Sequence, residues 1–253
     1  MRGVVAAWLE RIYLAPGTQP RQEDARKIDE LTALLPELRA AVNQQPRQLT
    51  IVDAASGLSY AALATAELVL APAQRRAHVI LIEREPRLAA RARDAASRIS
   101  APGCTVEVRT GDVADATLWP AAPDLVIALH ACGAASDRVL DAALAASARR
   151  LLLVPCCTGV GVDAEPGARQ AAAALGIPRH AAVRRSFIEA WVAAERTLRL
   201  EAGGMQTEVV EFCPKAVTPY NLLWRARRVR EPGRMAAARA ELERLQQPRE
   251  EPR

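Results

Sequence analysis

The sequence lacks any long apolar run, although half of its 253 residues are apolar. No stretch approaches the ~18–20 apolar residues that a helix needs to span a bilayer. Charged residues also return too early in the first segment for a secretory leader. These absences predict a cytoplasmic protein without a membrane partner. The length suits one α/β domain with appendages.

Lysine and aromatic residues are scarce as well. Lys27 and Lys215 are the only lysines, so arginine supplies almost all of the positive charge behind the formal net charge of +5. Aromatic residues make up 4 % of the chain, which leaves few side chains on which RNA bases could stack. The basic balance permits an anionic partner without requiring one.

Glycine-rich phosphate loops are missing too. The first predicted strand, residues 49–53, is followed by the turn Asp-Ala-Ala-Ser-Gly-Leu-Ser, which holds one glycine at Gly57. A dinucleotide-binding fold needs Gly-x-Gly-x-x-Gly at this point, so that the main chain can approach a pyrophosphate. No Gly-Lys-Ser/Thr occurs anywhere in the chain. The sequence therefore argues against NAD, FAD and a nicotinamide-dependent reductase.

Short apolar runs alternate with segments of helical periodicity. The predicted strands cover residues 49–53, 79–83, 104–109, 125–129 and 151–154, and the predicted helices between them cover about 59–71, 86–99, 114–119 and 135–148. Two further helices, about 165–175 and 185–200, precede two late strands at 205–212 and 220–229. Five β–α units in succession predict a Rossmann-like, doubly wound α/β sheet, and the late strands predict an antiparallel pair at one edge.

The chain divides into three predicted parts. Residues 1–46 form an N-terminal helical cap, residues 47–230 the α/β domain, and residues 231–253 a C-terminal helix and tail. The second cap helix, about 22–41, carries an apolar face made of Ile28, Leu31, Leu34, Leu35 and Leu38. We expect this cap to pack on the sheet, close over the pocket and help to select the substrate.

Acidic residues follow the first three predicted strands: Asp53, Glu83 and Asp112. The carboxyl ends of parallel strands form the ligand-binding edge of such a sheet. S-adenosyl-L-methionine carries an ammonium, a ribose diol and an adenine but no phosphate. Glu83 can accept hydrogen bonds from both ribose hydroxyls, and Asp112 can accept one from the adenine amine. One such acid alone could be a helix cap, but together they predict a methyltransferase.

A cluster of His130, Cys132, Cys156 and Cys157 follows the fourth and fifth strands. Three interpretations are open: small buried cysteines beside a hydrogen-bonded histidine, a methyl-acceptor pocket with His130 as general base, or covalent or zinc chemistry. The spacing lacks Cys-x-x-Cys, and adjacent cysteines rarely bind one zinc ion, so no metal is predicted. Disulfides are not expected in the cytosol.

Three segments of the sequence resemble a known family. They are Asp124-Leu-Val-Ile-Ala-Leu-His-Ala-Cys-Gly, Val154-Pro-Cys-Cys and Phe212-Cys-Pro-Lys-Ala-Val-Thr-Pro-Tyr-Asn-Leu-Leu-Trp-Arg-Ala. They resemble the class I methyltransferase domain shared by the methyltransferase-25-like proteins and the Trm13-type tRNA methyltransferases, over roughly residues 47–230. The resemblance implies a seven-stranded Rossmann-like fold that binds S-adenosyl-L-methionine, and by position it implies that Asp53, Gly57, Glu83 and Asp112 line the cofactor.

The first turn departs from that family. Its members usually have Asp-x-Gly-x-Gly-Lys-Gly, whereas this chain has Ala55, Leu58 and Ser59 in place of the first glycine, the lysine and the last glycine. The methyl group of an alanine can obstruct the methionine part of the cofactor. The alternative hypothesis is therefore a catalytically inactive methyltransferase fold that serves as a binding or scaffold protein.

The predicted site combines these observations. Its cofactor residues are Asp53, Ala55, Gly57, Glu83, Asp112, Val113, Leu129 and His130, and its candidate catalytic residues are His130, Cys132, Cys156 and Asn221. RNA, and tRNA in particular, is favoured as acceptor over a small molecule or a protein. The resemblance, the basic charge and the four arginines of residues 224–230 support that choice, although a strand there would place Arg225 and Arg227 on one face and Trp224 on the other.

Overall fold

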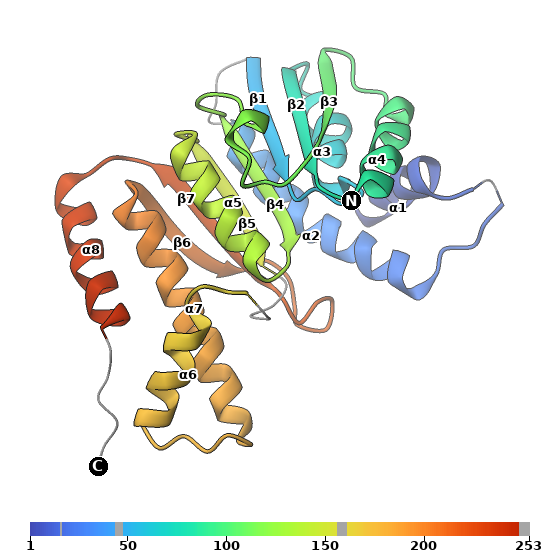
Figure 1. Ribbon diagram of the computed structural model, residues 1–253. Coiled ribbons are helices and arrows are strands. Elements are labelled where there is room, and N and C mark those ends of the chain that lie inside the picture. Colours follow the sequence, from blue (N-terminus) through green and yellow to red (C-terminus); the bar gives the residue numbers. More distant parts are fainter. Residues whose placement is uncertain (16, 44–47, 156–160, 248–253) are drawn as a thin grey trace.

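A seven-stranded sheet runs through the computed structural model, which describes residues 1–15, 17–43, 48–155 and 161–247 (Figure 1). The strands are β1 Gln48–Ala54, β2 Arg76–Glu83, β3 Cys104–Thr110, β4 Leu125–Ala131, β5 Arg150–Pro155, β6 Met205–Glu211 and β7 Leu222–Arg228. Their order is β3-β2-β1-β4-β5-β7-β6; β1 to β5 are parallel, and β7 is antiparallel to both of its neighbours. The predicted Rossmann-like fold with antiparallel last strands is confirmed.

Most helices differ from the predictions only at their ends, but the helix predicted over about 114–119 is a 3₁₀ turn of three residues. The helices are α1 Arg2–Tyr13, α2 Gln22–Asn43, α3 Tyr60–Ala64, α4 Pro86–Arg98, α5 Ala134–Ala145, α6 Glu165–Ala174, α7 Ala182–Ala202 and α8 Pro232–Gln246, with a 3₁₀ turn at Ala116–Leu118. The helix predicted over 59–71 is divided, because a π-helical segment, Thr65–Leu70, follows α3. The Thr65 hydroxyl donates to the carbonyl oxygen of Ala61 at 2.7 Å, a contact that commonly bends helices.

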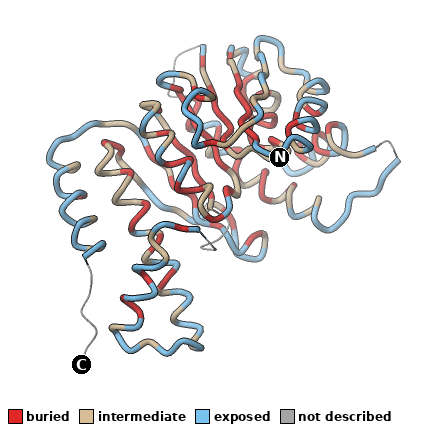
Figure 2. The backbone as a smooth tube through the Cα atoms, in the orientation of Figure 1, coloured by how far each residue is buried: buried red, intermediate tan, exposed pale blue. Residues whose placement is uncertain are grey.

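The central strands are buried on both faces, which explains why their sequences lack polar alternation. Ile51 of β1 belongs to the apolar cluster under α1, α2 and α3, whereas the next residue, Val52, belongs to the cluster under α5 and α7. Both side chains are 0 % exposed. Figure 2 shows this burial as a red core along the central strands. The edge strand β3 alternates between more and less exposed residues, as predicted.

The apolar face predicted for the second cap helix lies against the sheet. The five residues of that face are at most 3 % exposed, and they share a core with β1 and β2. In α1, the Tyr13 hydroxyl donates to the carbonyl oxygen of Leu58 at 2.9 Å, which ties this helix to the turn after β1. No helix in the described part of the chain is long and apolar enough to cross a membrane.

Helices α6 and α7 form a hairpin that projects from the sheet in Figure 1. A small apolar cluster that includes Val162, Ala168, Ile188 and Val192 joins its two helices. At the base of the hairpin, Nε of the buried Arg196 donates to Oδ1 of Asp137 in α5 at 2.7 Å. The hairpin is thus anchored to the sheet through a buried charged pair.

Candidate functional site

A cavity of about 330 Å³ lies at the carboxyl ends of the central strands, the expected place for a ligand in this fold. It is lined by Ala55, Glu83, Arg84, Gly111, Asp112, Val113, His130, Ala131, Cys132, Ala134, Ala135 and Arg138. Five of the eight predicted cofactor residues are therefore brought together here. The other three, Asp53, Gly57 and Leu129, are not among the lining residues.

Glu83 ends β2 at the floor of this cavity and is 6 % exposed. Its carboxylate accepts hydrogen bonds from the main-chain nitrogen of Gly57 at 2.7 Å and from that of Glu85 at 2.8 Å. Each carboxylate oxygen retains a second lone pair. Glu83 thus fixes the turn after β1 and can still accept hydrogen bonds from a ligand.

Asp53, near the end of β1, is 2 % exposed and is not among the residues that line the cavity. Burial raises the pKa of its carboxyl group to about 8; the hydrogen bond from the main-chain nitrogen of Ala62 lowers the pKa, and the charge of Glu83 raises it further. A cation bound nearby would favour the charged form of Asp53. The carboxyl group of Asp53 therefore accepts a hydrogen bond from the first turn of α3, and it becomes negatively charged when a cation binds nearby.

Asp112 lies after β3, on the far side of the cavity. Oδ1 accepts a hydrogen bond from the main-chain nitrogen of Ala114, and Oδ2 accepts one from Nη1 of Arg138, both at 2.9 Å. Arg138 belongs to α5 and was not predicted as a site residue, because helical spacing alone gives no reason to place it at the strand ends. It fixes the orientation of Asp112.

The backbone of the turn after β1 shows why the Asp-x-Gly-x-Gly-Lys-Gly pattern has glycine at three positions. Ala55, Gly57 and Ser59 all have positive φ, at 54°, 56° and 61°, and these are the three glycine positions of Asp-x-Gly-x-Gly-Lys-Gly. Residues other than glycine pay roughly 1–2 kcal/mol in this left-handed region. Ser59 is also fully buried, and its hydroxyl has no hydrogen-bond partner in the described part of the chain. The chain keeps the geometry of the turn at some cost in stability.

Replacing Ser59 by glycine is expected to raise the free energy of unfolding by roughly 1 kcal/mol, because the strain and the unpaired hydroxyl both disappear. Thermal unfolding would then shift upward by about 2–4 °C. Ser56→Gly is the matched control, since the Ser56 hydroxyl is also unpaired but its φ is not positive. The control should lose stability; a gain of equal size in both variants would contradict the strain argument.

His130 lies within β4, which runs two residues past its predicted end, and has a positive φ of 60°. Its Nε2 contacts the carboxylate of Glu30 in the helical cap, and its Nδ1 is buried without a hydrogen-bond partner among the residues that the structure describes. Glu30 is 3 % exposed and also pairs with Lys27 at 2.5 Å. Burial raises the pKa of Glu30, but the hydrogen bond with His130 and the charge of Lys27 outweigh it, so the pKa is lowered.

This contact bears directly on the histidine's chemistry. A carboxylate on Nε2 favours the tautomer with the proton on that nitrogen, which leaves the Nδ1 lone pair available as a base. Glu30 was missed by the sequence analysis. The available signal was a lone acid one turn before Leu34, on the apolar face of the cap helix.

The remaining candidate catalytic residues are placed differently. Cys132 lines the cavity and is disulfide-bonded, so the expectation of reduced thiols is wrong for this residue. Cys104 and Cys213 are free. Cys156, like Cys157, lies outside the described residues. Asn221 is 2 % exposed and donates from Nδ2 to the carbonyl oxygen of Cys213 at 2.8 Å.

Asn221 is not among the residues that line the cavity with His130. It lines a separate cavity of about 370 Å³, which also includes Pro155 at the end of β5. Pro155 is the pairing partner of Ala131 in β4. The two cavities therefore lie at the ends of neighbouring strands.

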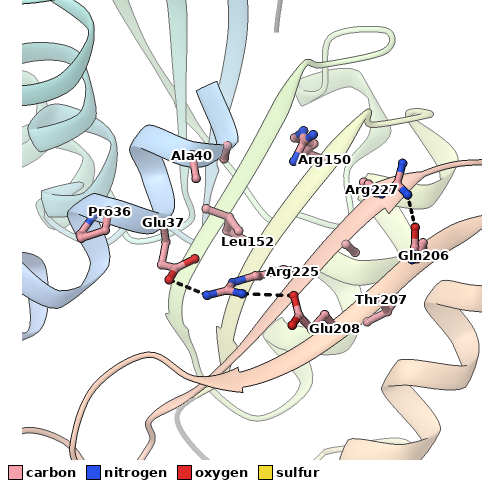
Figure 3. A pocket seen from close by; sticks show the side chains of 12 residues that line it. Pro36, Glu37, Ala40, Arg150, Leu152, Gln206, Thr207, Glu208, Arg225 and Arg227 are labelled. Carbon is pink, nitrogen blue, oxygen red and sulfur yellow. Dashed lines mark hydrogen bonds and ion pairs between the residues drawn. The ribbon is translucent and has the colours of Figure 1, made fainter. Parts of the chain in front are cut away.

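A larger cavity, of about 640 Å³, lies between α2 and the β5–β7–β6 edge of the sheet (Figure 3). Figure 3 shows Arg225 between Glu37 and Glu208, with ion pairs of 2.6 Å and 3.1 Å. Arg150 and Arg227 in its lining lie at the amino end of β5 and the paired end of β7. This cavity is therefore at the opposite end of the sheet from the ligand-binding edge, and volume alone does not identify the site.

The smaller cavity fits a ligand of mixed charge. Glu83 and Asp112 line it, and the buried Asp53 has a raised pKa that a neighbouring cation would lower. Arg84 and Arg138 at the same cavity can balance a carboxylate. No group of three or more possible metal ligands occurs among the described side chains. This donor set matches a ligand with a sulfonium, an ammonium, a carboxylate and a diol.

The fold and this cavity define a class I methyltransferase domain. The chain matches the family model described as a methyltransferase domain over residues 24–160, more than half of its length, and it belongs to that family. The magnesium protoporphyrin IX methyltransferase of Synechocystis PCC 6803, solved with S-adenosylhomocysteine bound, has a similar fold. It shares 17 % identity at a TM-score of 0.51, over 90 % of this chain and 100 % of that chain.

Aeropyrum pernix fibrillarin, solved with S-adenosyl-L-methionine, matches at a TM-score of 0.47 with 15 % identity, over 78 % of this chain and 74 % of that chain. None of the curated proteins is detectably similar to this chain in sequence. Membership in the family thus rests on the sequence match, and the similarity to the Synechocystis enzyme bears on the fold alone.

Proposed function

We propose that this methyltransferase uses S-adenosyl-L-methionine to methylate RNA, with tRNA the favoured class. The observation that carries the cofactor assignment is the cavity at the strand ends, which Glu83 and Asp112 line together. When bound, the cofactor supplies an electrophilic methyl group on a sulfonium.

The chain's own residues divide the work of binding. Glu83 would accept hydrogen bonds from the ribose diol, and Asp112, oriented by Arg138, would accept one from the adenine amine. Asp53 would balance the ammonium group. These contacts contribute mainly positioning, which is the chief requirement of an in-line displacement.

His130 would take the proton from the acceptor. Its Nε2 is held by Glu30, and its buried Nδ1 has no hydrogen-bond partner among the described residues, so Nδ1 is the nitrogen left for that step once the acceptor reaches it. A base of this kind is required when the acceptor is a hydroxyl or a protonated amine. Glu30 would act as a positioning residue, because it holds the histidine ring with one carboxylate oxygen and pairs with Lys27 through the other.

The RNA acceptor is supported by the net charge of +5 and by the resemblance to tRNA methyltransferases. The arginines of residues 224–230, however, are largely engaged within the protein. Arg225 pairs with two carboxylates, and Arg228 donates to the carbonyl oxygens of Ala148, Gly203 and Leu144. RNA contacts are therefore expected elsewhere on the surface.

The alternative of an inactive scaffold has no further support. It depends on Ala55 and Ser59, yet both residues adopt the left-handed backbone that the glycines of the pattern would adopt. The turn is therefore strained but correctly shaped.

Calorimetric titration with S-adenosyl-L-methionine and S-adenosylhomocysteine tests the cofactor first. Micromolar affinity, about −8 kcal/mol, is expected, and absence of binding at millimolar ligand would make the scaffold hypothesis the better one. Transfer of a labelled methyl group to unmodified tRNA then tests the acceptor. Label that survives protease but not ribonuclease is the expected result; label in protein or in small molecules would contradict the RNA acceptor.

Replacing His130 by alanine is expected to lower kcat by roughly 10²–10⁴-fold, the usual contribution of a general base. Cofactor affinity should change by much less, because the predicted cofactor acids remain. Glu30→Gln should give a smaller loss of kcat and a shifted pH profile, since it keeps the ring and removes the charge that the ring and Lys27 share. Unchanged kcat in His130→Ala would contradict the assignment.

A further inference from the structure

Two adjacent cavities form one groove along α7. The cavity of about 370 Å³ begins at Pro155, beside the site, and the cavity of about 510 Å³ lies at the tip of the α6–α7 hairpin. Arg185, Glu189 and Tyr220 line both cavities. We call the joined cavities the α7 groove. Figure 1 shows that the hairpin which carries it extends away from the sheet.

The outer part of the α7 groove is cationic. Arg179, Arg184 and Arg185 line it, and none of the three pairs with a carboxylate among the described residues. Arg169 pairs with Glu165 at 2.5 Å, so these two charges cancel. His180 lines the same cavity, where Glu189 and Glu165 supply the acids. The outer groove therefore carries an excess of positive charge at the tip of the hairpin.

The cationic tip is held in place by hydrogen bonds. The guanidinium group of Arg184 donates to the carbonyl oxygens of Ile177 at 2.6 Å and Arg169 at 3.0 Å. These two bonds fix the loop between α6 and α7, which presents Arg179 and His180 to solvent. A ligand therefore meets groups that are already ordered, which lowers the entropic cost of binding.

Tyr220 is the aromatic side chain where the two cavities meet, and it is 45 % exposed. Its main-chain nitrogen donates to the Thr218 hydroxyl at 3.3 Å, and the next residue, Asn221, is anchored to Cys213. The ring is thus presented from a fixed loop. An exposed aromatic ring beside arginines is the combination that binds unstacked nucleotides.

The inner end of the groove leads toward the cofactor cavity. Pro155 pairs with Ala131, the residue after His130. Arg196 lines this end; it is 2 % exposed, and its Nη2 has no hydrogen-bond partner in the described structure. Arg185 and Arg196 are eleven positions apart on one helix, or about 16 Å at 1.5 Å per residue. That length suits a polymer better than a single small anion.

From this arrangement we infer that the α7 groove binds the RNA acceptor: Arg179 and Arg185 contact backbone phosphates, and one base stacks on Tyr220. The inference rests on the proposed RNA acceptor and names where that acceptor lies. It gives the α6–α7 hairpin the role of the element that selects the acceptor.

The test measures binding of a fluorescently labelled, unmodified tRNA transcript to the full chain by anisotropy at several salt concentrations. The double variant Arg179→Ala/Arg185→Ala should bind roughly tenfold more weakly. The slope of log affinity against log salt concentration should become shallower by about 1.4, because two phosphate contacts are lost. Arg39→Ala/Arg239→Ala is the matched control, because both arginines are exposed and form no ion pair among the described residues. Its affinity should stay within about twofold.

Tyr220 gives a second, independent readout. Tyr220→Leu should weaken binding by roughly tenfold through loss of stacking, whereas Tyr220→Phe should bind nearly as the unaltered protein does. In methyl transfer, the double variant Arg179→Ala/Arg185→Ala (the hairpin variant) should have a higher KM for tRNA and an unchanged kcat. Cofactor affinity, measured by titration, should be unchanged in all of these variants, which shows that they are folded.

The outcomes separate the groove from the proposed function. Equal tRNA affinity in the hairpin variant and its control would refute the assignment of the α7 groove as the RNA-binding site. If the same protein still methylated RNA, the proposed acceptor class would stand. A protein that binds the cofactor but neither binds nor methylates tRNA would overturn both. Loss of binding in the hairpin variant alone supports the groove.

Discussion

Replacing Glu83 by alanine is expected to weaken S-adenosyl-L-methionine binding by about 100-fold or more. The carboxylate would lose two hydrogen bonds to the ribose diol, and hydrogen bonds to charged groups contribute about 1.5–3 kcal/mol each. A loss of about 3 kcal/mol corresponds to just over 100-fold in affinity. Calorimetric titration measures this change directly.

The controls must separate ligand binding from support of the turn, because Glu83 also accepts hydrogen bonds from Gly57 and Glu85. Glu83→Gln keeps the side-chain volume and should also bind the cofactor poorly, since an amide nitrogen cannot accept a hydrogen bond. Glu85→Ala removes a neighbouring acid that does not line the cavity; it should cost about 1 kcal/mol in stability as a lost helix cap. Unchanged cofactor affinity in Glu83→Ala would refute the ribose assignment.

Asp53 should make the cofactor-free protein less stable as the pH rises. Its pKa is about 8 in the folded protein, whereas an unfolded aspartate titrates near ~3.9. Between these values the folded state holds a proton that the unfolded state has released, so stability falls with pH by about 1.36 kcal/mol per unit. The effect is absent below the unfolded pKa and complete above the folded pKa.

Asp53→Asn should remove this dependence. The amide oxygen can still accept from Ala62, which keeps the cap on α3. From pH 5 to pH 8 the unaltered protein should lose roughly 4 kcal/mol relative to the variant. Urea unfolding at several pH values gives the comparison, and parallel curves for the two proteins would contradict the raised pKa. Asp115→Asn is the exposed control, because hydrogen bonds from Thr117 lower the pKa of the Asp115 carboxylate, which therefore stays charged from pH 5 to pH 8.

Local sequence patterns predicted the fold because they describe burial directly. Apolar runs of four to six residues marked strands covered on both faces, and the acids after them marked the ligand-binding edge. Ala55, Glu83 and Asp112 meet at one cavity for that reason. The roles assigned to the predicted site residues, and the boundaries of the three predicted parts, are still predictions.

Contacts between distant segments could not be predicted in this way. Glu30 and His130 are 100 positions apart, and no periodicity relates a cap helix to the end of β4. Asp53 was predicted as a cofactor residue, and in the structure it is buried, accepts a hydrogen bond from Ala62 of α3 and does not line the cavity. Asn221 belongs to a neighbouring cavity, because the loop before β7 is fixed through Cys213. Three-dimensional packing decided each of these placements.

The strand order has a consequence for synthesis of the chain. β7 lies between β5 and β6, although it is the last strand to be made. Until Leu222–Arg228 leaves the ribosome, the apolar β5 is an unpaired edge and β6 has no neighbour. An exposed apolar edge is a template for pairing with other chains. A nascent chain that stalls before β7 is therefore prone to aggregate, and chaperone protection matters most over this last part of translation.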